Sequence, residues 1–323
     1  MSTKSITESA EIRELVVVQR TAGAEETDEG GQKTRGRVQL LRDELTLSAP
    51  CMVLGRELRQ RRQALKLDQQ DVAKVLRWSK SKVSRIEGGR IGIDQRDLED
   101  LFSLYRIDDA GREPMRELAL IGKRPEWWKK WSGITTAYLQ AVMSFEDVAQ
   151  RIRSYEPQYL NGLLQTPEYA KAVIGRGSDP SNHAALVELR QQRQAKFAET
   201  PGKELVCVID EVSLLRPVGN ARIMRRQVQH LIELNEDPRY QLRLAELNRS
   251  LPSEVGSTMI FDFAEKLLPT IAYSENFDGG LVIQDEESVD RRVRKFDMLR
   301  HMSLSPTATT QKLHHLLQSN CYR

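Results

Sequence analysis

A run of short polar and basic side chains between residues 79 and 85 has the composition of a DNA contact surface. Lys and Arg neutralise phosphate charge, Arg also forms paired hydrogen bonds with base edges, and hydroxyl groups bond to phosphate oxygens. The candidate contact residues are Gln69, Ser79, Lys80, Ser81, Lys82, Ser84 and Arg85. The sequence therefore predicts that these side chains bind a double-stranded DNA operator.

Short helices with apolar inner faces are needed to position these side chains. Leucines at helical spacing indicate a first helix over residues 54–65. Asp68 and Ser79 stand where N-caps belong, and they predict a second helix that begins at Gln69 and a third helix that ends before a Gly-Gly pair. This order of caps, helices and turn predicts a helix-turn-helix whose third helix enters the major groove.

Positive charge is concentrated in the same segment. Residues 53–90 carry eleven Lys and Arg against four Asp and Glu, whereas residues 91–122 carry four against eight. The whole chain is nearly balanced, with 49 Lys and Arg, 46 Asp and Glu and a net charge of +3. This balance excludes a uniformly basic coat protein, and it localises the predicted DNA interface to one small domain.

Arg59, Arg62 and Glu87 are predicted to form a structural ion pair within the helical domain. A carboxylate beside the DNA backbone repels the phosphates, so Glu87 is expected to have basic partners of its own. We therefore interpret these three residues as stabilising the domain rather than as contacting DNA.

The helix-turn-helix segment resembles the lambda-repressor-like XRE regulators over residues 52–122. The resemblance rests on residues 58–62, 67–69, 72–73 and 81–90. It implies roles as phosphate anchors and base readers for Gln69 and for residues 79–85. This sequence has Arg77 where the family usually has Gly in the turn. In a left-handed conformation, Arg costs about 1 kcal/mol relative to Gly.

Composition and periodicity divide the chain into an arm, a small domain, a linker and a larger domain. We predict a flexible arm over residues 1–48, the helix-turn-helix domain over 49–122, a Trp-rich linker over 123–138 and an α+β domain over 139–320. Helical periodicity occurs in residues 139–153, 166–174, 183–198, 220–235, 286–303 and 307–318, and strand-like runs occur in residues 205–209, 241–244, 258–263, 270–273 and 281–283. The predicted fold class is an N-terminal all-α helix-turn-helix domain followed by a larger α+β domain.

Trp127, Trp128 and Trp131 cluster in the linker, and two interpretations of them remain open. Trp127 and Trp128, together with Tyr155, are a candidate effector pocket, because aromatic rings bind cationic and aromatic ligands. Tryptophans at this spacing also anchor a linker on a neighbouring core, and this second interpretation is favoured.

Motifs of several other function classes do not occur in the sequence. The five His residues have no metal-ligand spacing, and there is no P-loop, dinucleotide-binding glycine motif or nucleophile elbow. The apolar runs are too short to span a membrane, and Cys51, Cys207 and Cys321 are an odd set that suits a reducing compartment. We therefore predict a cytoplasmic protein that is not an enzyme, with no cofactor, no metal and no membrane partner.

The C-terminal half resembles the Scr-type, antitoxin-like domain that accompanies DNA-binding domains of this kind. The resemblance rests on residues 127–128, 155–156, 162–170, 190–193 and 209–211. It implies a regulator that is often encoded beside a small partner protein, and we predict that this domain dimerises and senses a small-molecule effector or binds a small partner protein. The predicted function is an XRE-type, sequence-specific transcriptional regulator that acts as a homodimer. The alternative is an antitoxin-like protein that mainly binds a small partner protein and uses DNA binding for autoregulation.

Overall fold

The computed structural model describes most of the chain beyond the N-terminal arm. The described residues are 38–41, 48–124, 126–252, 256–263, 269–276, 279–319 and 322. The arm predicted over residues 1–48 therefore lies largely outside the described residues, and within it Val38–Leu41 form strand β1. Cys321 also lies outside them, whereas Cys51 and Cys207 are buried free thiols.

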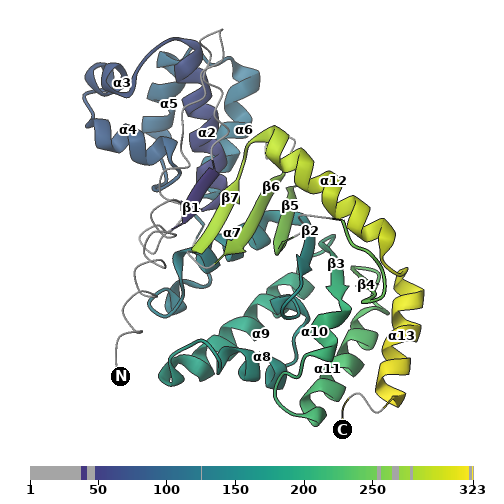
Figure 1. Ribbon diagram of the computed structural model, residues 1–323. Helices are drawn as coiled ribbons and strands as arrows, with labels where there is room; N and C mark the ends of the chain where they lie inside the picture. Colours follow the sequence, from purple (N-terminus) through teal and green to yellow (C-terminus); the bar gives the residue numbers. More distant parts are fainter. Residues whose placement is uncertain are drawn as a thin grey trace, which may run out of the picture. The chain divides into compact units, whose positions relative to one another are not determined.

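The N-terminal region from residue 49 to residue 121 is helical, as predicted. Its helices are α2 (Ala49–Ala64), α3 (Gln69–Leu76), α4 (Lys80–Glu87), α5 (Gln95–Leu104) and α6 (Asp109–Ile121) (Figure 1). The first helix begins at Ala49 rather than at the predicted residue 54, because Pro50 occupies its first turn, where proline is tolerated. Leu58, Val83 and Phe102 are almost fully buried and form part of the core between the helices.

The closest approach in this region joins α2 to the end of α4. A Cβ atom on Gly55 would lie 2.4 Å from the backbone oxygen of Ile86. Gly89, directly after α4, has a φ of +68°, and a Cβ atom there would lie 2.5 Å from the Cα atom of Met52. Glycine at both positions therefore lets the two helix backbones come together.

The Gly55→Ala variant is expected to lower the free energy of unfolding by about 1 to 3 kcal/mol, because the new methyl group overlaps backbone atoms that cannot rotate away. Hydrogen exchange of peptides from α2 and α4 measures the loss directly. Gly92→Ala is the control, since a Cβ atom at Gly92 meets no atom within 4 Å. Equal exchange in the two variants would contradict the packing argument.

The C-terminal domain is an α+β domain built on a mixed sheet, which confirms the predicted fold class. Within the described residues the sheet has seven strands in the order β1-β7-β6-β5-β2-β3-β4. The bounds of β2 to β7 are Ala149–Glu156, Glu204–Asp210, Tyr240–Ala245, Thr258–Phe263, Ile271–Asn276 and Gly279–Ile283. The pairs β2–β3 and β3–β4 are parallel, and the other neighbouring pairs are antiparallel.

The helix predicted over residues 139–153 is wrong in its last part, residues 149–153. Helix α7 (Ala137–Val148) ends where β2 begins, and β2 pairs with strands on both sides. Ile152 continues the helical spacing of α7, but it also alternates with Arg151 and Arg153, as strand residues do. Arg151 pairs with Glu204 of β3 at 2.9 Å, and Arg153 pairs with Asp262 of β5 at 2.8 Å. Pairing with two neighbouring strands therefore outweighs the local helical pattern.

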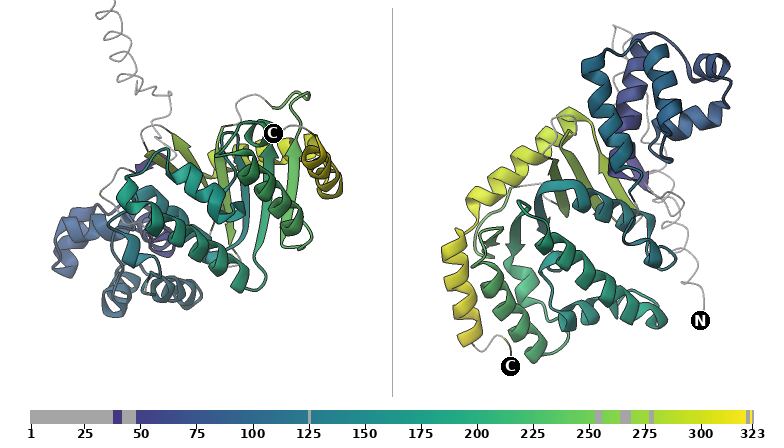
Figure 2. Two further views of the ribbon diagram at one scale, coloured as in Figure 1. Left: turned by 90° about the horizontal axis from the view of Figure 1, so that it is seen from below. Right: turned by 180° about the vertical axis from the view of Figure 1, so that it is seen from behind.

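Helices cover both faces of the sheet (Figures 1 and 2). The larger core lies on the face that carries α7, α8 (Pro167–Ile174), α9 (His183–Glu199) and α11 (Ala221–Leu234), while α12 (Glu286–Met302) packs on the opposite face. Helix α13 (Pro306–Gln318) packs against α11 and β4. The shorter helical elements are η1 (Lys129–Trp131), η2 (Gly162–Leu164), η3 (Pro180–Asn182) and α10 (Glu211–Leu215).

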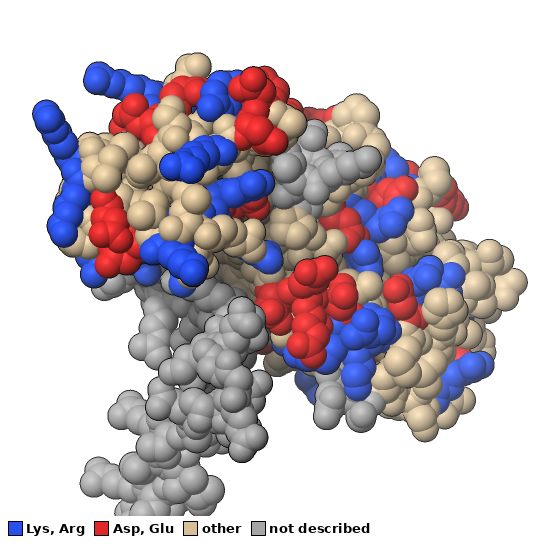
Figure 3. Space-filling model, turned by 90° about the horizontal axis from the view of Figure 1, so that it is seen from above, with Lys and Arg blue, Asp and Glu red and all other residues tan. Residues whose placement is uncertain are grey.

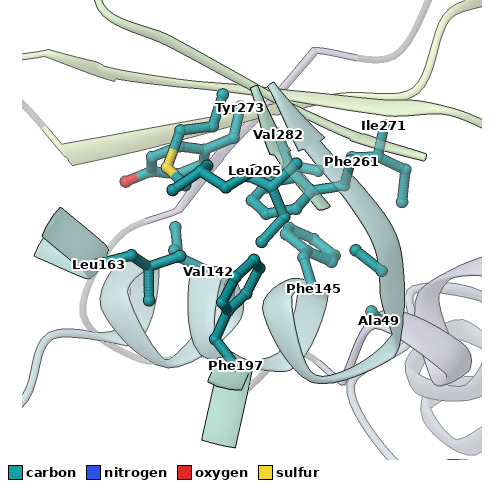
Figure 4. Packing of buried hydrophobic residues seen from close by; sticks show 14 of the residues in the cluster. Ala49, Val142, Phe145, Leu163, Phe197, Leu205, Phe261, Ile271, Tyr273 and Val282 are labelled. Atoms are coloured by element: carbon teal, nitrogen blue, oxygen red, sulfur yellow. The ribbon is translucent and has the colours of Figure 1, made fainter. Parts of the chain in front are cut away.

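Alternation along the central strands separates the two cores. Leu205 and Cys207 of β3 lie in the core shared with α7 and α9, whereas Val206 lies in the core shared with α12. On the α7 face, the rings of Phe145 and Phe261 lie 5.3 Å apart (Figure 4). Within a regular stretch of one strand, the face of a polar residue therefore follows from its spacing to a buried residue of the same strand.

Candidate nucleic-acid interface

Helix α4 buries one face and exposes the other. Val83 and Ile86 have exposed fractions of 2% and 4% and pack in the domain core. Lys80, Ser81 and Arg85 are exposed, and the other two candidate residues of the helix are half-buried. Within the described residues, Lys80 and Arg85 form no ion pair. The exposed side of α4 therefore presents two unpaired cations and at least one hydroxyl group to solvent.

Side-chain caps fix where α3 and α4 begin, at the predicted residues. Asp68 and Asp71 form a capping box at the start of α3, each carboxylate accepting a hydrogen bond from the backbone N–H of the other residue. Ser79 Oγ accepts a hydrogen bond from the backbone N–H of Lys82 at 3.1 Å. Arg77, between the two helices, adopts the left-handed conformation with φ 55° and ψ 40°. The turn thus keeps the shape expected for glycine despite its larger residue.

A buried ion pair between Arg62 and Glu87 joins two helices of the candidate interface domain. Arg62 donates hydrogen bonds to the two carboxylate oxygens of Glu87 at 2.6 and 3.0 Å, and these bonds raise the pKa of Arg62. Gln69 Nε2 donates to Glu87 Oε2 at 2.8 Å. Arg59 is half-buried and forms no ion pair within the described part of the chain. The structure therefore brings Gln69 together with Arg62 and Glu87 and leaves Arg59 outside the pair.

Lys82 is also held by other side chains of the domain. Its Nζ atom lies 2.6 Å from Asp97 Oδ2 of α5 and 4.0 Å from the centre of the Trp78 ring. Asp97 is the contact that the sequence analysis missed, because no local spacing connects it with α4. The charge of Lys82 is partly neutralised by this carboxylate, so Lys80 and Arg85 carry the larger share of the unpaired positive charge on α4.

Acidic groups interrupt the basic surface of the molecule. In the view of Figure 3, Lys and Arg side chains project between Asp and Glu side chains and form no continuous basic coat. This agrees with the net charge of +3 for the whole chain. A DNA contact on such a surface must be local and depends on the few exposed cations that face the DNA.

The structure does not bring the three residues of the predicted effector pocket together. Trp128 and Trp131 are buried with Met143 of α7 in a small core, and Trp127 packs edge-on against both rings at 5.4 and 6.2 Å. Tyr155 lies in the separate core beneath α12, and its hydroxyl donates a hydrogen bond to Asp210 at 2.8 Å. The geometry of the tryptophans is that of an anchor on α7 and α9 rather than of an open cage.

The described residues contain neither a metal-binding cluster nor a helix that could span a membrane. Among them, no group of three or more His, Cys, Asp and Glu residues is arranged to hold a metal ion. No helix in the same part of the chain has the length and apolar character needed to cross a membrane. Neither observation adds a second candidate site.

Comparison with known protein families gives two matches. Residues 139–315, which are more than half of the chain, match the family described as a domain of unknown function (DUF5753). Residues 53–115 match a family described as a helix-turn-helix domain. Neither the curated proteins nor the solved structures give a match. The helix-turn-helix family supports DNA binding, while the larger match leaves the activity of the C-terminal domain undefined.

Proposed function

The chain belongs to the family of the domain of unknown function DUF5753, and we propose that it is a sequence-specific transcriptional regulator of the XRE type. The observation that carries this proposal is the division of α4 into a buried apolar face and an exposed face with Lys80, Ser81 and Arg85. A short capped helix of this kind fits the major groove and places donors beside base edges.

The proposed regulator acts in the cytoplasm as a homodimer on two-fold symmetric operators. Two helix-turn-helix units bind half-sites about one helical turn apart, roughly 34 to 36 Å. The larger C-terminal domain supplies the subunit contact and senses an effector or a partner protein. Selection of bound sequences from random DNA with the full chain tests the symmetry, because a dimer enriches inverted repeats at one fixed spacing.

Arg85→Ala is expected to weaken binding to the selected operator by about 1 to 3 kcal/mol, since Arg85 is exposed on α4 and suited to a bidentate contact with guanine. Lys80→Ala is expected to act in the same direction. Fluorescence anisotropy with labelled operator DNA measures both losses.

The affinity of the wild-type chain for operator DNA should also fall as the salt concentration rises, with a log-log slope of about −0.9 for each phosphate contacted.

Arg294→Ala on α12 is the matched control, because Arg294 is exposed and forms no ion pair within the described residues. Wild-type affinity in both the Lys80 and Arg85 variants would refute the assignment of α4 as the recognition helix. Constant co-purification of a small protein, combined with DNA binding only at the chain's own gene, would instead favour the antitoxin-like alternative.

A further inference from the structure

A cavity of about 350 Å³ lies on the α7–α9 face of the sheet, where β2 ends. Its volume falls within the range of about 300 to 1,000 Å³ that is usual for small-molecule sites. Leu139 and Val142 of α7, Val173 of α8 and Leu186 and Leu189 of α9 form its apolar wall. The cavity is thus a half-open pocket lined by three of the helices that cover the larger core.

Strand alternation supplies the polar floor of this cavity. Ile152 of β2 packs in the larger core, so Glu156 of the same strand faces the same side of the sheet. Tyr273 and Glu275 of β6 also line the cavity, next to one another on their face of the strand. The neighbouring residue Tyr155 faces the opposite side, beneath α12. The cavity therefore gathers two carboxylates from separate strands, Glu156 of β2 and Glu275 of β6.

Arg190 of α9 contributes a cation that has no acidic partner. Its Nη1 atom donates a hydrogen bond to the amide oxygen of Gln165, and it forms no ion pair within the described residues. Burial lowers the pKa of Arg190 to about 10. Arg193, one turn later, differs because Glu146 binds it through two hydrogen bonds of 3.0 and 2.6 Å. The charge of Arg193 is thus already neutralised, whereas that of Arg190 is not.

Glu156 is the corresponding acid without a basic partner. It accepts one hydrogen bond from Asn161 Nδ2 at 3.1 Å and forms no ion pair in the described part of the chain. Burial is the main reason that the pKa of Glu156 is raised to about 7, and the neighbouring Glu275 adds to the shift. Glu156 and Arg190 are both half-buried, and the surface that they expose lines the cavity.

Tyr273 lies at the wall of the cavity and carries a buried, unpartnered hydroxyl. Its side chain is only 3% exposed, and its hydroxyl has no hydrogen-bond partner among the described residues. A buried hydroxyl without a partner is unfavourable, and most such groups in native proteins are paired. The hydroxyl oxygen itself has almost no accessible surface, so Tyr273 lines the cavity with other atoms of its side chain, and the ligand argument rests on Arg190 and Glu156.

We propose that this cavity binds a small zwitterionic molecule with an apolar side chain, whose carboxylate contacts Arg190 and whose ammonium group contacts Glu156. Both residues line one cavity, yet they do not pair with each other, and a ligand with both charges pairs each of them. A neutral ligand leaves both charges unpaired, and a ligand with a single charge leaves one of them unpaired. The apolar wall then accepts the side chain of an amino acid or a short peptide.

The proposal rests on the proposed role of the C-terminal domain as a sensor, but its test does not depend on DNA binding. Isothermal titration calorimetry of the full chain without DNA uses L-leucine, L-phenylalanine and glycyl-L-leucine as zwitterionic probes. We expect saturable binding of at least one of them below about 10 mM. The leucine analogues leucinol, which lacks the carboxylate, and 4-methylpentanoate, which lacks the amine, should each bind about tenfold more weakly or not at all.

Two variants assign the contacts. Arg190→Gln and Glu156→Gln are each expected to weaken the binding of the tightest-binding probe about tenfold or more. Arg190→Gln should also abolish the preference for ligands with a carboxylate, and Glu156→Gln should abolish the preference for ligands with an ammonium group. Arg294→Gln and Glu286→Gln are the matched controls, because both residues are exposed on α12 and lie outside the cavity lining. Circular dichroism of each variant checks that it folds.

Saturable binding with this variant pattern supports the proposal. Absence of saturable binding for all three probes, or equal binding by the wild type and both folded cavity variants, overturns it. In either negative case, operator binding by the same preparation is measured separately, because it tests the proposed regulator and not the ligand site. A chain that binds DNA but no probe thus refutes the ligand site alone, and a chain that binds a probe but no DNA refutes the proposed regulator.

Discussion

Arg62→Met is expected to destabilise the helix-turn-helix region by about 3 to 5 kcal/mol, the range for removing one partner of a buried ion pair. Glu87 is 5% exposed, so its carboxylate would remain buried with only the hydrogen bond from Gln69. Arg62 also donates a hydrogen bond to the backbone oxygen of Leu67, which the variant loses. Hydrogen exchange of peptides from α2, α3 and α4 measures the effect, and operator affinity should fall with it.

Two further variants separate this effect from a general loss of positive charge. Arg61→Met removes the neighbouring arginine, whose pair with Glu57 is exposed to solvent, and should change stability by less than about 1 kcal/mol. The double variant Arg62→Met with Glu87→Met should recover part of the stability, because it leaves no unpaired charge in the core. A double variant that is less stable than Arg62→Met alone would contradict this explanation.

Local signals were sufficient to predict the boundaries of α3 and α4. Asp68 and Ser79 cap the helices through hydrogen bonds to residues three positions later, so the whole interaction lies within a few residues of sequence. The buried positions of α4 followed from helical spacing for the same reason. The predicted and observed helices agree here because the contacts that determine them join residues close together in the sequence.

Contacts between distant segments could not be predicted in this way. Lys82 and Gln69 have the residue types of DNA contacts, but Asp97 and Glu87 bind them across the domain. Residue type alone does not show which of several similar cations has a partner in the fold. The sequence predicts helix for residues 149–153 of β2 because the identity of this strand depends on pairing with β3 and β5, which lie far along the chain.

At the candidate cavity, too, the face on which one residue lies could not be predicted from the local sequence. The sequence predicts Tyr155 as a pocket residue, and in the structure the adjacent Glu156 lines the cavity. Once β2 is assigned as a strand, side-chain alternation separates the two residues to opposite faces of the sheet. The pairing of β2 with β3 and β5, which lie far along the chain, thus decides which of the two residues faces the α7 side.

Glu156→Gln is expected to stabilise the protein at about pH 8 by about 3 to 4 kcal/mol and to have little effect at about pH 4.5. In the folded protein the pKa of Glu156 is about 7, whereas an unfolded Glu titrates near 4.3. Between these two values the folded state holds a proton that the unfolded state has released. Stability from this group therefore falls as pH rises from about 4.5 to about 7, and it stays low above that.

The amide of Gln removes this titration while it still accepts a hydrogen bond from Asn161. Urea unfolding of the wild type and of the variant at both pH values measures the difference, and Glu286→Gln should show no such dependence. The other charged groups around Glu156 are Glu275, Arg190, Arg193 and Glu146, and they are unchanged in the variant. A stability difference that is equal at both pH values would mean that Glu156 does not titrate as described. If a zwitterionic probe binds as proposed, its ammonium group stabilises the ionised carboxylate, so the difference at high pH should shrink when the probe is present.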